Sequence, residues 1–459
     1  MPYILNKYYP WRNLLFVFGE GLLIFLIING VFISWAGITE FRDLLALYIS
    51  RALVVTLVFQ ICFYYSDLYD LNIIPTLSDH ALKVIQTFGI GCVVLALIYY
   101  LFPSLNISTR VFGCGLGGVA LAIFIWRFFY FKILEHRMFV QPIVVVGTGS
   151  YAGEIVDAVE NKKDTGFKVE ALVGRGNLPV KTGRIPVFSD FKKLREFCNQ
   201  RKIGKIVVAL EEKRGMPLHE LIQFKFLGIE VLDGAKFYEG LTGKVPVKRI
   251  NPSWLVFSDG FYVGRLNKML KRAMDVGVSL TMLLITLPIF MITALIIKLE
   301  SPGKIFYRQQ RVGENGEVFE ITKFRSMKEN AEENGPVWAA TDDWRVTGFG
   351  RFIRKTRIDE LPQLLNVLRG DMSFVGPRPE RPVFVADLLK DIPFYGNRHH
   401  VKPGITGWAQ INYPYGSCVE DALRKLEYDL YYIKNLSIGI DLLTILQTIK
   451  VVLLQRGAR

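Results

Sequence analysis

The sequence predicts a membrane protein with three parts: a four-helix transmembrane bundle, an α/β domain, and an α+β domain with a re-entrant membrane helix and interfacial helices. Two observations predict this class. Hydrophobic residues make up 51% of the 459 residues while 21% are charged, so the apolar residues must be concentrated in segments. Those segments are four long runs near the N-terminus and one later run, separated by polar and alternating sequence.

The chain is strongly basic, with a formal net charge of +14 at pH 7. A basic chain can bind nucleic acid or the anionic face of a membrane. Because long apolar runs are present, membrane lipids are the simpler partner, and we expect no nucleic acid. The five cysteines form no C-x-x-C pair or Cys/His cluster, so neither a disulfide framework nor a zinc site is expected.

Four apolar runs lie at residues 13–35, 44–65, 82–102 and 111–131. Each is close to the ~20 residues that a helix needs to cross a bilayer. We therefore expect four transmembrane helices within residues 1–137.

Basic residues flank this region, with Lys7 and Arg12 before the first run and Arg127 and Lys132 at the end of the last. This distribution places both ends in the cytoplasm. The acidic loop at residues 66–80 does not support that orientation. No run carries a pair of acids or bases suited to an ion path, so we interpret the bundle as an anchor rather than a transporter.

The second part, residues 138–240, begins with the sequence I-V-V-V-G-T-G-S-Y-A-G from Ile143. An apolar strand, a glycine turn and a helix in this order are typical of a Rossmann-like domain, in which Gly147 and Gly149 let the backbone approach a phosphate. The acid expected after the second strand, to hold a ribose hydroxyl, is absent, because that position reads Val173-Gly174. We favour a degenerate structural or regulatory domain over a working dinucleotide site.

A linker at residues 241–264 leads into the third part, residues 265–459. This part opens with a basic stretch, R-L-N-K-M-L-K-R, and an apolar run at residues 276–297. Because both flanks of the run are basic, a crossing helix would place one flank on the wrong side. We predict a helix broken at Leu287 and Pro288 that enters the membrane at about residues 273–298 and returns. The alternative is a fifth, proline-kinked span.

Acids, arginines, glycines and prolines are most densely packed between Asp343 and Glu380. At the centre, Asp359 and Glu360 are adjacent and precede Leu361-Pro362, which reads as a helix N-cap followed by a first turn. The pair could be an ordinary helix start. The same geometry also suits phosphate and metal chemistry, because an ionised aspartate can attack phosphorus and a glutamate can bind Mg²⁺.

Cations surround the acid pair in the sequence. Arg378 lies between two prolines that restrict its backbone, Arg354 precedes the acids on a predicted helix, and Lys323 ends a predicted hairpin strand. Arginine binds phosphate through two parallel hydrogen bonds. For each cation taken singly, solvation or an ion pair to Glu360 is as good an interpretation as substrate binding.

Together with P-G-I-T-G-W-A-Q-I-N at residues 403–412, these motifs resemble the bacterial sugar transferase family, the monotopic phosphoglycosyl transferases that act on polyprenyl phosphate. The whole chain is similar to its long members, of the undecaprenyl-phosphate glucose or galactose phosphotransferase type, which start exopolysaccharide or O-antigen units. The resemblance implies Asp359 as nucleophile, Glu360 with Asp359 as Mg²⁺ ligands, and Lys323, Arg354 and Arg378 as contacts to the phosphates or the acids.

The resemblance also implies an enzyme of the bacterial inner membrane whose catalytic domain faces the cytoplasm. It would transfer a sugar 1-phosphate from a UDP-sugar to undecaprenyl phosphate and release UMP. The sequence does not reveal the sugar, and it leaves open whether the protein forms a homo-oligomer.

Two alternatives remain at this point. A membrane-anchored nucleotide-sugar dehydratase needs a Tyr-x-x-x-Lys pair in the α/β domain, but the only such spacing is Tyr3 with Lys7. A non-enzymatic scaffold for polysaccharide enzymes leaves the acid pair unexplained. Near the C-terminus we expect interfacial helices at residues 420–432 and 438–454, with Asp429 on a helix surface and Asp371 as a turn cap.

Overall fold

The computed structural model forms two compact units, Met1–Ile4 with Tyr8–Phe237, and Leu5–Lys7 with Tyr238–Arg459. The predicted boundary at residues 137 and 138 and the start of the charged stretch at Asp343 lie outside the residues that the structure describes. The described residues are 3–4, 7–8, 11–70, 77–135, 140–161, 165–174, 185–211, 216–250, 252–328, 345–414, 416 and 418–453.

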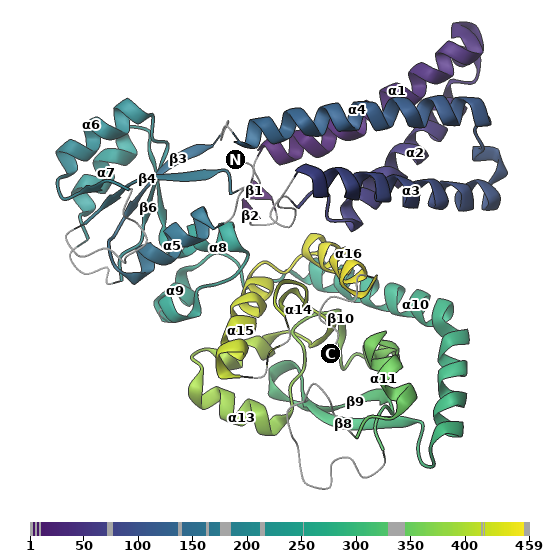
Figure 1. The fold of residues 1–459 in the computed structure, drawn as a ribbon. Coiled ribbons are helices and arrows are strands. Elements are labelled where there is room, and N and C mark those ends of the chain that lie inside the picture. The colour runs from purple at the N-terminus through teal and green to yellow at the C-terminus, as the bar shows by residue number, and fades with distance from the viewer. Residues whose placement is uncertain are drawn as a thin grey trace. The chain divides into compact units, whose positions relative to one another are not determined.

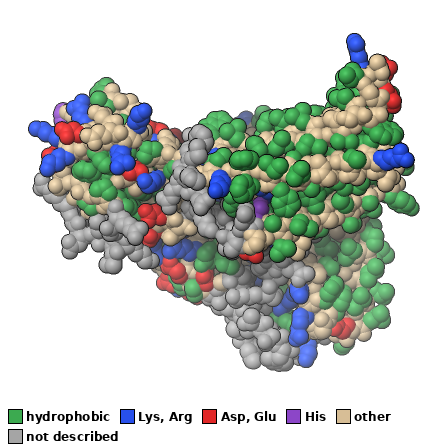
Figure 2. Space-filling model, turned by 45° about the horizontal axis from the view of Figure 1, so that its top comes forward, with side chains coloured by type: hydrophobic (Ala, Val, Ile, Leu, Met, Phe, Trp, Pro, Cys, Tyr) green, Lys and Arg blue, Asp and Glu red, His purple; other side chains and the backbone are tan. Residues whose placement is uncertain are grey.

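Four long helices form the N-terminal part of the first unit. Each is long and apolar enough to cross a membrane, as is one helix of the second unit. Each contributes a fully buried side chain to a common core: Ile24, Phe59, Leu95 and Ile123. Hydrophobic side chains also cover the outer surface of these helices (Figure 2), as expected of a surface that faces lipid. The helices are α1 (Trp11–Asp43), α2 (Leu45–Tyr65), α3 (Leu77–Leu101) and α4 (Thr109–Glu135), with a short turn η1 (Pro103–Leu105) and two short strands, β1 (Tyr3–Ile4) and β2 (Lys7–Tyr8), outside them.

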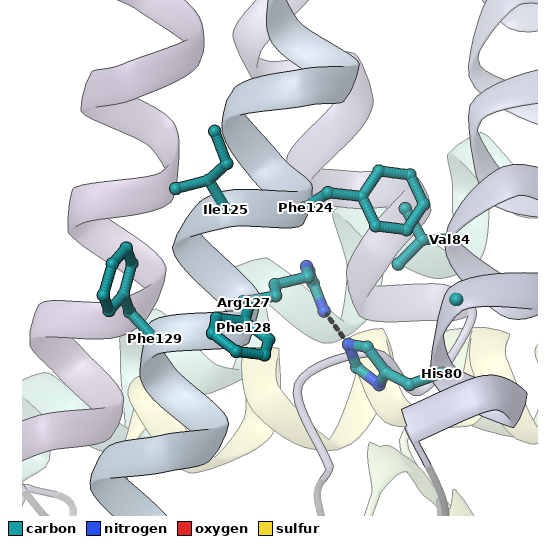
Figure 3. Close-up of a pocket in the computed structure, with 8 residues that line it drawn as sticks. His80, Val84, Phe124, Ile125, Arg127, Phe128 and Phe129 are labelled. Atoms are coloured by element: carbon teal, nitrogen blue, oxygen red, sulfur yellow. Dashed lines mark hydrogen bonds between the residues drawn. The ribbon is translucent and has the colours of Figure 1, made fainter.

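A buried ion pair links α1 to α4, which the sequence did not indicate. Arg127 donates to both carboxylate oxygens of Glu20 at 2.7 and 3.0 Å, and to the ring of His80 at 2.8 Å (Figure 3). A mostly apolar cavity of about 430 Å³ adjoins Arg127 and His80 between α3 and α4. Removing one partner would leave a buried charge, so we expect the loss of either side chain to destabilise the packing of α1 on α4.

A five-stranded parallel sheet forms the α/β domain, in the order β5-β4-β3-β6-β7. With β3 as the first strand, this is the 3-2-1-4-5 order of a Rossmann-like fold. Helices α6 and α7 lie on one face of the sheet and α5 on the other (Figure 1). The elements are β3 (Gln141–Val146), α5 (Ser150–Glu160), β4 (Phe167–Val173), β5 (Val187–Phe188), α6 (Phe191–Arg201), β6 (Lys205–Val208), α7 (Leu218–Phe226) and β7 (Glu230–Asp233). Helix α8 (Gly234–Thr242) follows, and the boundary between the two units falls within it, after Phe237.

The glycine turn after β3 is closed by the chain itself. Gly147 has a φ of +139°, and a Cβ there would lie 2.3 Å from the carbonyl oxygen of Ala209, so only glycine fits. At the start of α5, the Glu211 carboxylate accepts hydrogen bonds from the Ser150 amide at 2.9 Å and the Ser150 hydroxyl at 2.8 Å. A side chain of the protein therefore uses the donors that a Rossmann-like domain offers to a phosphate.

The second unit is an α+β domain built around a hairpin, a short parallel strand pair and several helices (Figure 1). Strands β8 and β9 pair antiparallel, and β10 pairs parallel with β11. The elements are η2 (Val247–Arg249), α9 (Pro252–Phe257), α10 (Arg265–Glu300), β8 (Phe306–Val312), η3 (Glu314–Gly316), β9 (Val318–Phe324), α11 (Gly348–Lys355), η4 (Ile358–Glu360), α12 (Gln363–Arg369), β10 (Ser373–Val375), α13 (Pro382–Asp391), η5 (Tyr395–His400), β11 (Gly404–Thr406), α14 (Trp408–Asn412), α15 (Val419–Lys434) and α16 (Ile438–Leu453).

Helix α10 contains the predicted break point. The backbone stays helical through Leu287 and Pro288, so the chain bends rather than breaks (Figure 1). Pro288 has no N–H to donate to the Leu284 carbonyl, and the Thr286 hydroxyl bonds back to the Met282 carbonyl at 2.7 Å; both features bend helices. The path of this helix through the membrane remains a prediction.

The segment predicted as a linker packs against the rest of the second unit. The Trp408 indole donates to the Gly243 carbonyl at 2.8 Å, and the Val245 amide donates to the Glu427 carbonyl at 2.9 Å. Residues 243–245 are therefore part of the folded unit rather than a free connection. Glu239, which was predicted to lie in the α/β domain, also belongs to the second unit and pairs with Lys434 at 2.6 Å.

Helix α15 is more deeply buried than predicted. Tyr431 and Tyr432 are each 1% exposed, and Asp429, predicted on a helix surface, is also 1% exposed and pairs with Arg398. The prediction for Asp429 was wrong because an amphipathic pattern does not say whether the apolar face meets lipid or protein. The structure does not place this helix or α16 in a membrane, so their interfacial position stays a prediction.

Candidate active site

Glu360 is the centre of the acid cluster. Its Oε1 accepts from Arg378 Nη2 at 2.6 Å and from Lys323 Nζ at 3.1 Å, while its Oε2 lies 3.7 Å from Arg357 Nη1. These groups come from β9, from η4 and its flanking residue, and from the Pro-Arg-Pro segment. The fold therefore brings together three separate parts of the chain that the sequence had singled out.

The local backbone that presents the acids differs from the prediction. Asp359 was predicted to cap a helix, but it lies inside the 3₁₀ turn η4, and α12 begins only at Gln363, after Pro362. Arg357, with a left-handed φ of 61°, turns the chain out of α11 and into η4. Asp359 therefore does not occupy an N-cap position, and it is Glu360 that neighbouring cations hold in its ionised form.

The two acids have opposite electrostatic surroundings. Burial raises the pKa of Asp359 to about 6, against the opposing effect of Lys323. Burial alone would also raise the pKa of Glu360, but Arg378 and Lys323 outweigh it and hold that pKa well below its usual range. Glu360 is thus ionised at neutral pH, whereas Asp359, with a pKa of about 6, gains its proton in mildly acidic solution.

Lys323 contacts the acid pair directly, whereas Arg354 is bonded to Ser326. Burial lowers the pKa of Lys323, and the negative charge of Glu360 opposes this effect. The ion pair with Glu360 therefore favours the protonated form of Lys323. Arg354 donates its Nε–H to the Ser326 hydroxyl at 2.8 Å and acts on Asp359 as a nearby positive charge. The structure therefore brings all five predicted residues into one region, with Lys323 and Arg378 in direct contact with Glu360.

The backbone around Arg378 is held at four consecutive carbonyl groups. The Pro377 carbonyl accepts from the Gly404 amide at 2.9 Å, and the Glu380 carbonyl accepts from the Val312 amide at 2.9 Å. Side chains hold the two carbonyls between them, those of Arg378 and Pro379. The two prolines have no N–H of their own, so this segment is fixed almost entirely through its carbonyl oxygens.

The side chains at this site could supply only some of the ligands that Mg²⁺ needs. Among the described residues, no group of three or more His, Cys, Asp or Glu side chains is placed to hold a metal. Asp359 and Glu360 supply adjacent carboxylates, and Mg²⁺ is commonly held by one or two carboxylates while water and substrate phosphates complete its shell. The acid pair therefore suits a metal that arrives with a phosphate substrate.

Sequence reasoning missed three contacts. Arg398 and Arg311 each donate to a carbonyl of the Pro-Arg-Pro segment, and Asp429 pairs with Arg398. Arg398 stands in the stretch N-R-H-H that directly precedes V-K-P-G-I-T-G, and this position was the available signal. Its buried partner Asp429 could not be identified, because the contact joins segments that are far apart in the chain.

Paired carboxylates among fixed cations are typical of enzymes that act on phosphates. Together with the apolar helices, they define the class of the protein as a membrane enzyme of this kind. Residues 266–455 match the family described as bacterial sugar transferase, and residues 64–225 match a family described as CoA-binding domain. The chain belongs to the bacterial sugar transferase family.

Three relatives illustrate the match. A UDP-N-acetylgalactosamine-undecaprenyl-phosphate N-acetylgalactosaminephosphotransferase of Aeromonas hydrophila is 44% identical over 221 residues, which are 48% of this chain and 52% of that protein. A UDP-glucose:undecaprenyl-phosphate glucose-1-phosphate transferase of Escherichia coli (strain K12) is 42% identical over 186 residues, 40% of each chain. The exopolysaccharide production protein PSS of Rhizobium leguminosarum bv. phaseoli is 39% identical over 190 residues, 40% of this chain and 95% of that protein. The chain thus spans about half, or less, of the length of the first two relatives.

Proposed function

We propose that this protein transfers a sugar 1-phosphate from a UDP-sugar to undecaprenyl phosphate, forming undecaprenyl-diphosphate sugar and UMP. The observation that carries the proposal is the acid pair itself: Glu360 is held ionised by Arg378 and Lys323, directly beside Asp359. The names of the Aeromonas and Escherichia relatives support the substrate class. They do not specify the sugar that this chain uses.

The proposed reaction has two steps. The Asp359 carboxylate attacks the β-phosphorus of the UDP-sugar, a new P–O bond forms, and UMP leaves with the electrons of the broken P–O bond. An oxygen of undecaprenyl phosphate then attacks the same phosphorus and releases Asp359. Arg378 and Lys323 are placed to stabilise negative charge on the transferring group, because they are fixed before substrate arrives.

Asp359 and Glu360 would hold Mg²⁺ together with the diphosphate. When bound, the metal would neutralise phosphate oxygens in the ground state and the transition state. Glu360 Oε1 is shared by Lys323 and Arg378, whereas the described contact of Oε2 is the longer one to Arg357, so we assign the metal contact to Oε2.

The membrane assignment follows from the five apolar helices. We propose that α1–α4 span the bacterial inner membrane and that α10 enters and leaves on the cytoplasmic side, because both of its flanks are basic. The bend that Pro288 favours supports this path. A cysteine introduced at Asn315 should react with impermeant reagent only from the cytoplasmic side. Labelling from the periplasm would overturn the re-entrant path.

The catalytic proposal is tested with the purified full-length protein, a panel of UDP-sugars, undecaprenyl phosphate and Mg²⁺, scoring UMP release and lipid product. Asp359→Asn should lose more than about a thousandfold in kcat, because the amide is a poor nucleophile. The matched control is Asp387→Asn, which removes an exposed carboxylate from α13 and should leave kcat unchanged. UMP release at near wild-type rate by Asp359→Asn would refute the covalent route.

A further inference from the structure

We propose that Arg398 and Asp429 form a positioning pair that fixes the Arg378 guanidinium on Glu360. The inference rests on the proposed transfer reaction, in which Arg378 contacts the substrate phosphates. Neither Arg398 nor Asp429 reaches the acid pair through a described hydrogen bond. Their effect passes through the backbone of the Pro-Arg-Pro segment.

Arg398 contacts that backbone and two side chains, those of Tyr395 and Asp429. Its Nη2 donates to the Arg378 carbonyl at 2.9 Å, and its Nη1 donates to the Tyr395 hydroxyl at 2.6 Å. Asp429 Oδ2, from α15, lies 2.9 Å from the same Nη2. The guanidinium also sits over the Tyr395 ring, with Cζ 5.2 Å from the ring centroid. These contacts allow Arg398 essentially one orientation.

Burial makes the pair interdependent. The side chains of Arg398 and Asp429 are 6% and 2% exposed. A buried guanidinium without its carboxylate is strongly unfavourable, so loss of Asp429 would drive Arg398 toward water and away from the Arg378 carbonyl. Asp429 therefore holds Arg398, and Arg398 holds the backbone of Arg378.

The Arg378 carbonyl is a direct anchor of the residue that carries the guanidinium. The prolines on both sides lack N–H groups, so the segment cannot be fixed by strand pairing through its amides at those positions. Of its four consecutive carbonyls, that of Arg378 belongs to the residue whose side chain lies 2.6 Å from Glu360. A small displacement here would move the guanidinium directly, and misplacement of about 1 Å can lower a rate by about a hundredfold.

The test compares full-length variants with UDP-sugar, undecaprenyl phosphate and Mg²⁺. Asp429→Asn should lower kcat by about tenfold to a hundredfold, with KM for the UDP-sugar changed less than threefold. Asp387→Asn is the matched control, since it removes an exposed carboxylate that pairs with Lys390 on α13. Arg398→Lys keeps one donor for the Arg378 carbonyl and should recover part of the activity that Arg398→Met loses.

Folding is separated from positioning by the double variant Arg398→Met/Asp429→Leu. Apolar replacement of a buried ion pair is often neutral for stability, so this variant should melt near the wild type while keeping the low kcat. Hydrogen exchange of the Gly404 and Val312 amides, which donate to the Pro377 and Glu380 carbonyls, should be faster in it than in the wild type. Wild-type exchange and kcat in a folded double variant would overturn the positioning role. Because exchange needs no turnover, it decides this role even if the wild type releases no UMP, a result that would instead defeat the proposed function.

Discussion

Asp359 and Glu360 are adjacent in the chain, but their pKa values are shifted in opposite directions. Arg378 and Lys323 lower the pKa of Glu360, whereas burial raises that of Asp359 to about 6. The pair thus keeps one permanent negative charge and one group that gains its proton as the pH falls through about 6. Only the ionised carboxylate can attack phosphorus.

This difference predicts a pH profile that depends on metal. kcat/KM should fall as the pH decreases through about 6, because Asp359 becomes protonated. A cation beside the pair favours the ionised form, so raising the Mg²⁺ concentration should move this acid limb to lower pH. Profiles measured at two Mg²⁺ concentrations check the prediction. An acid limb that does not respond to Mg²⁺ would contradict metal binding at Asp359.

Although the Arg378 side chain is 30% exposed, we expect its charge to be important for the rate of transfer. Arg378→Ala should lower kcat by about a hundredfold to a thousandfold, the usual effect of removing a fixed charge from a transition state. The matched control is Lys390→Ala, which removes an exposed cation from α13 and should have little effect. Steady-state kinetics check both variants. Equal activities would show that Arg378 does not contact the reacting phosphate.

Sequence reasoning singled out Asp359, Glu360, Lys323, Arg354 and Arg378 because their motifs resemble those of the family. The structure brings the five into one region, and their roles stay predictions. Sequence reasoning could not find how they are held. The Arg398 contact to the Arg378 carbonyl depends on backbone geometry, and backbone groups leave no signature in the residue types. The prediction that Asp359 caps a helix was wrong, because the sequence D-E-L-P fits a 3₁₀ turn as well as a helix start.

At the scale of elements, the start of α5 resembles a phosphate site but is already filled. Glu211→Ala would free the Ser150 amide and hydroxyl, which now bind the Glu211 carboxylate. We expect the variant to bind inorganic phosphate or ADP more tightly than the wild type, measured by calorimetry. The control is Glu160→Ala, at the other end of the same helix. Equal affinities in wild type and Glu211→Ala would contradict this account.

The order of the α/β elements was predictable because strands and helices have different hydrophobic periods. The buried position of α15 was not. Its apolar face repeats like that of an interfacial helix, yet Tyr431 and Tyr432 pack inside the domain. Nor could the sequence show that Glu211 lies against α5, because that contact depends on the turn after β6.

At the scale of the whole molecule, the second unit begins before the predicted domain boundary at residue 265. The segment with Glu239 and Gly243 is bonded to Lys434 and Trp408. A fragment that starts at Gly234 should therefore be more stable than one that starts at Arg265, by about 3 kcal/mol for a buried ion pair and hydrogen bonds. Melting temperatures should differ by about 10 °C.

The Rhizobium relative, 95% of which aligns with this chain, indicates that a module of this size exists as a protein. Both fragments should therefore fold in detergent. Equal melting temperatures would show that residues 234–264 contribute nothing to the stability of the second unit.

The four anchored carbonyls of the Pro-Arg-Pro segment also have a kinetic consequence. In the proposed reaction, a guanidinium on a backbone held in this way would serve the UDP-sugar, UMP and the lipid phosphate in turn. The reaction should then follow ping-pong kinetics, in which excess undecaprenyl phosphate occupies the free enzyme and inhibits it. The rigidity of a few peptide groups would thereby set how the rate responds to the supply of lipid in the membrane.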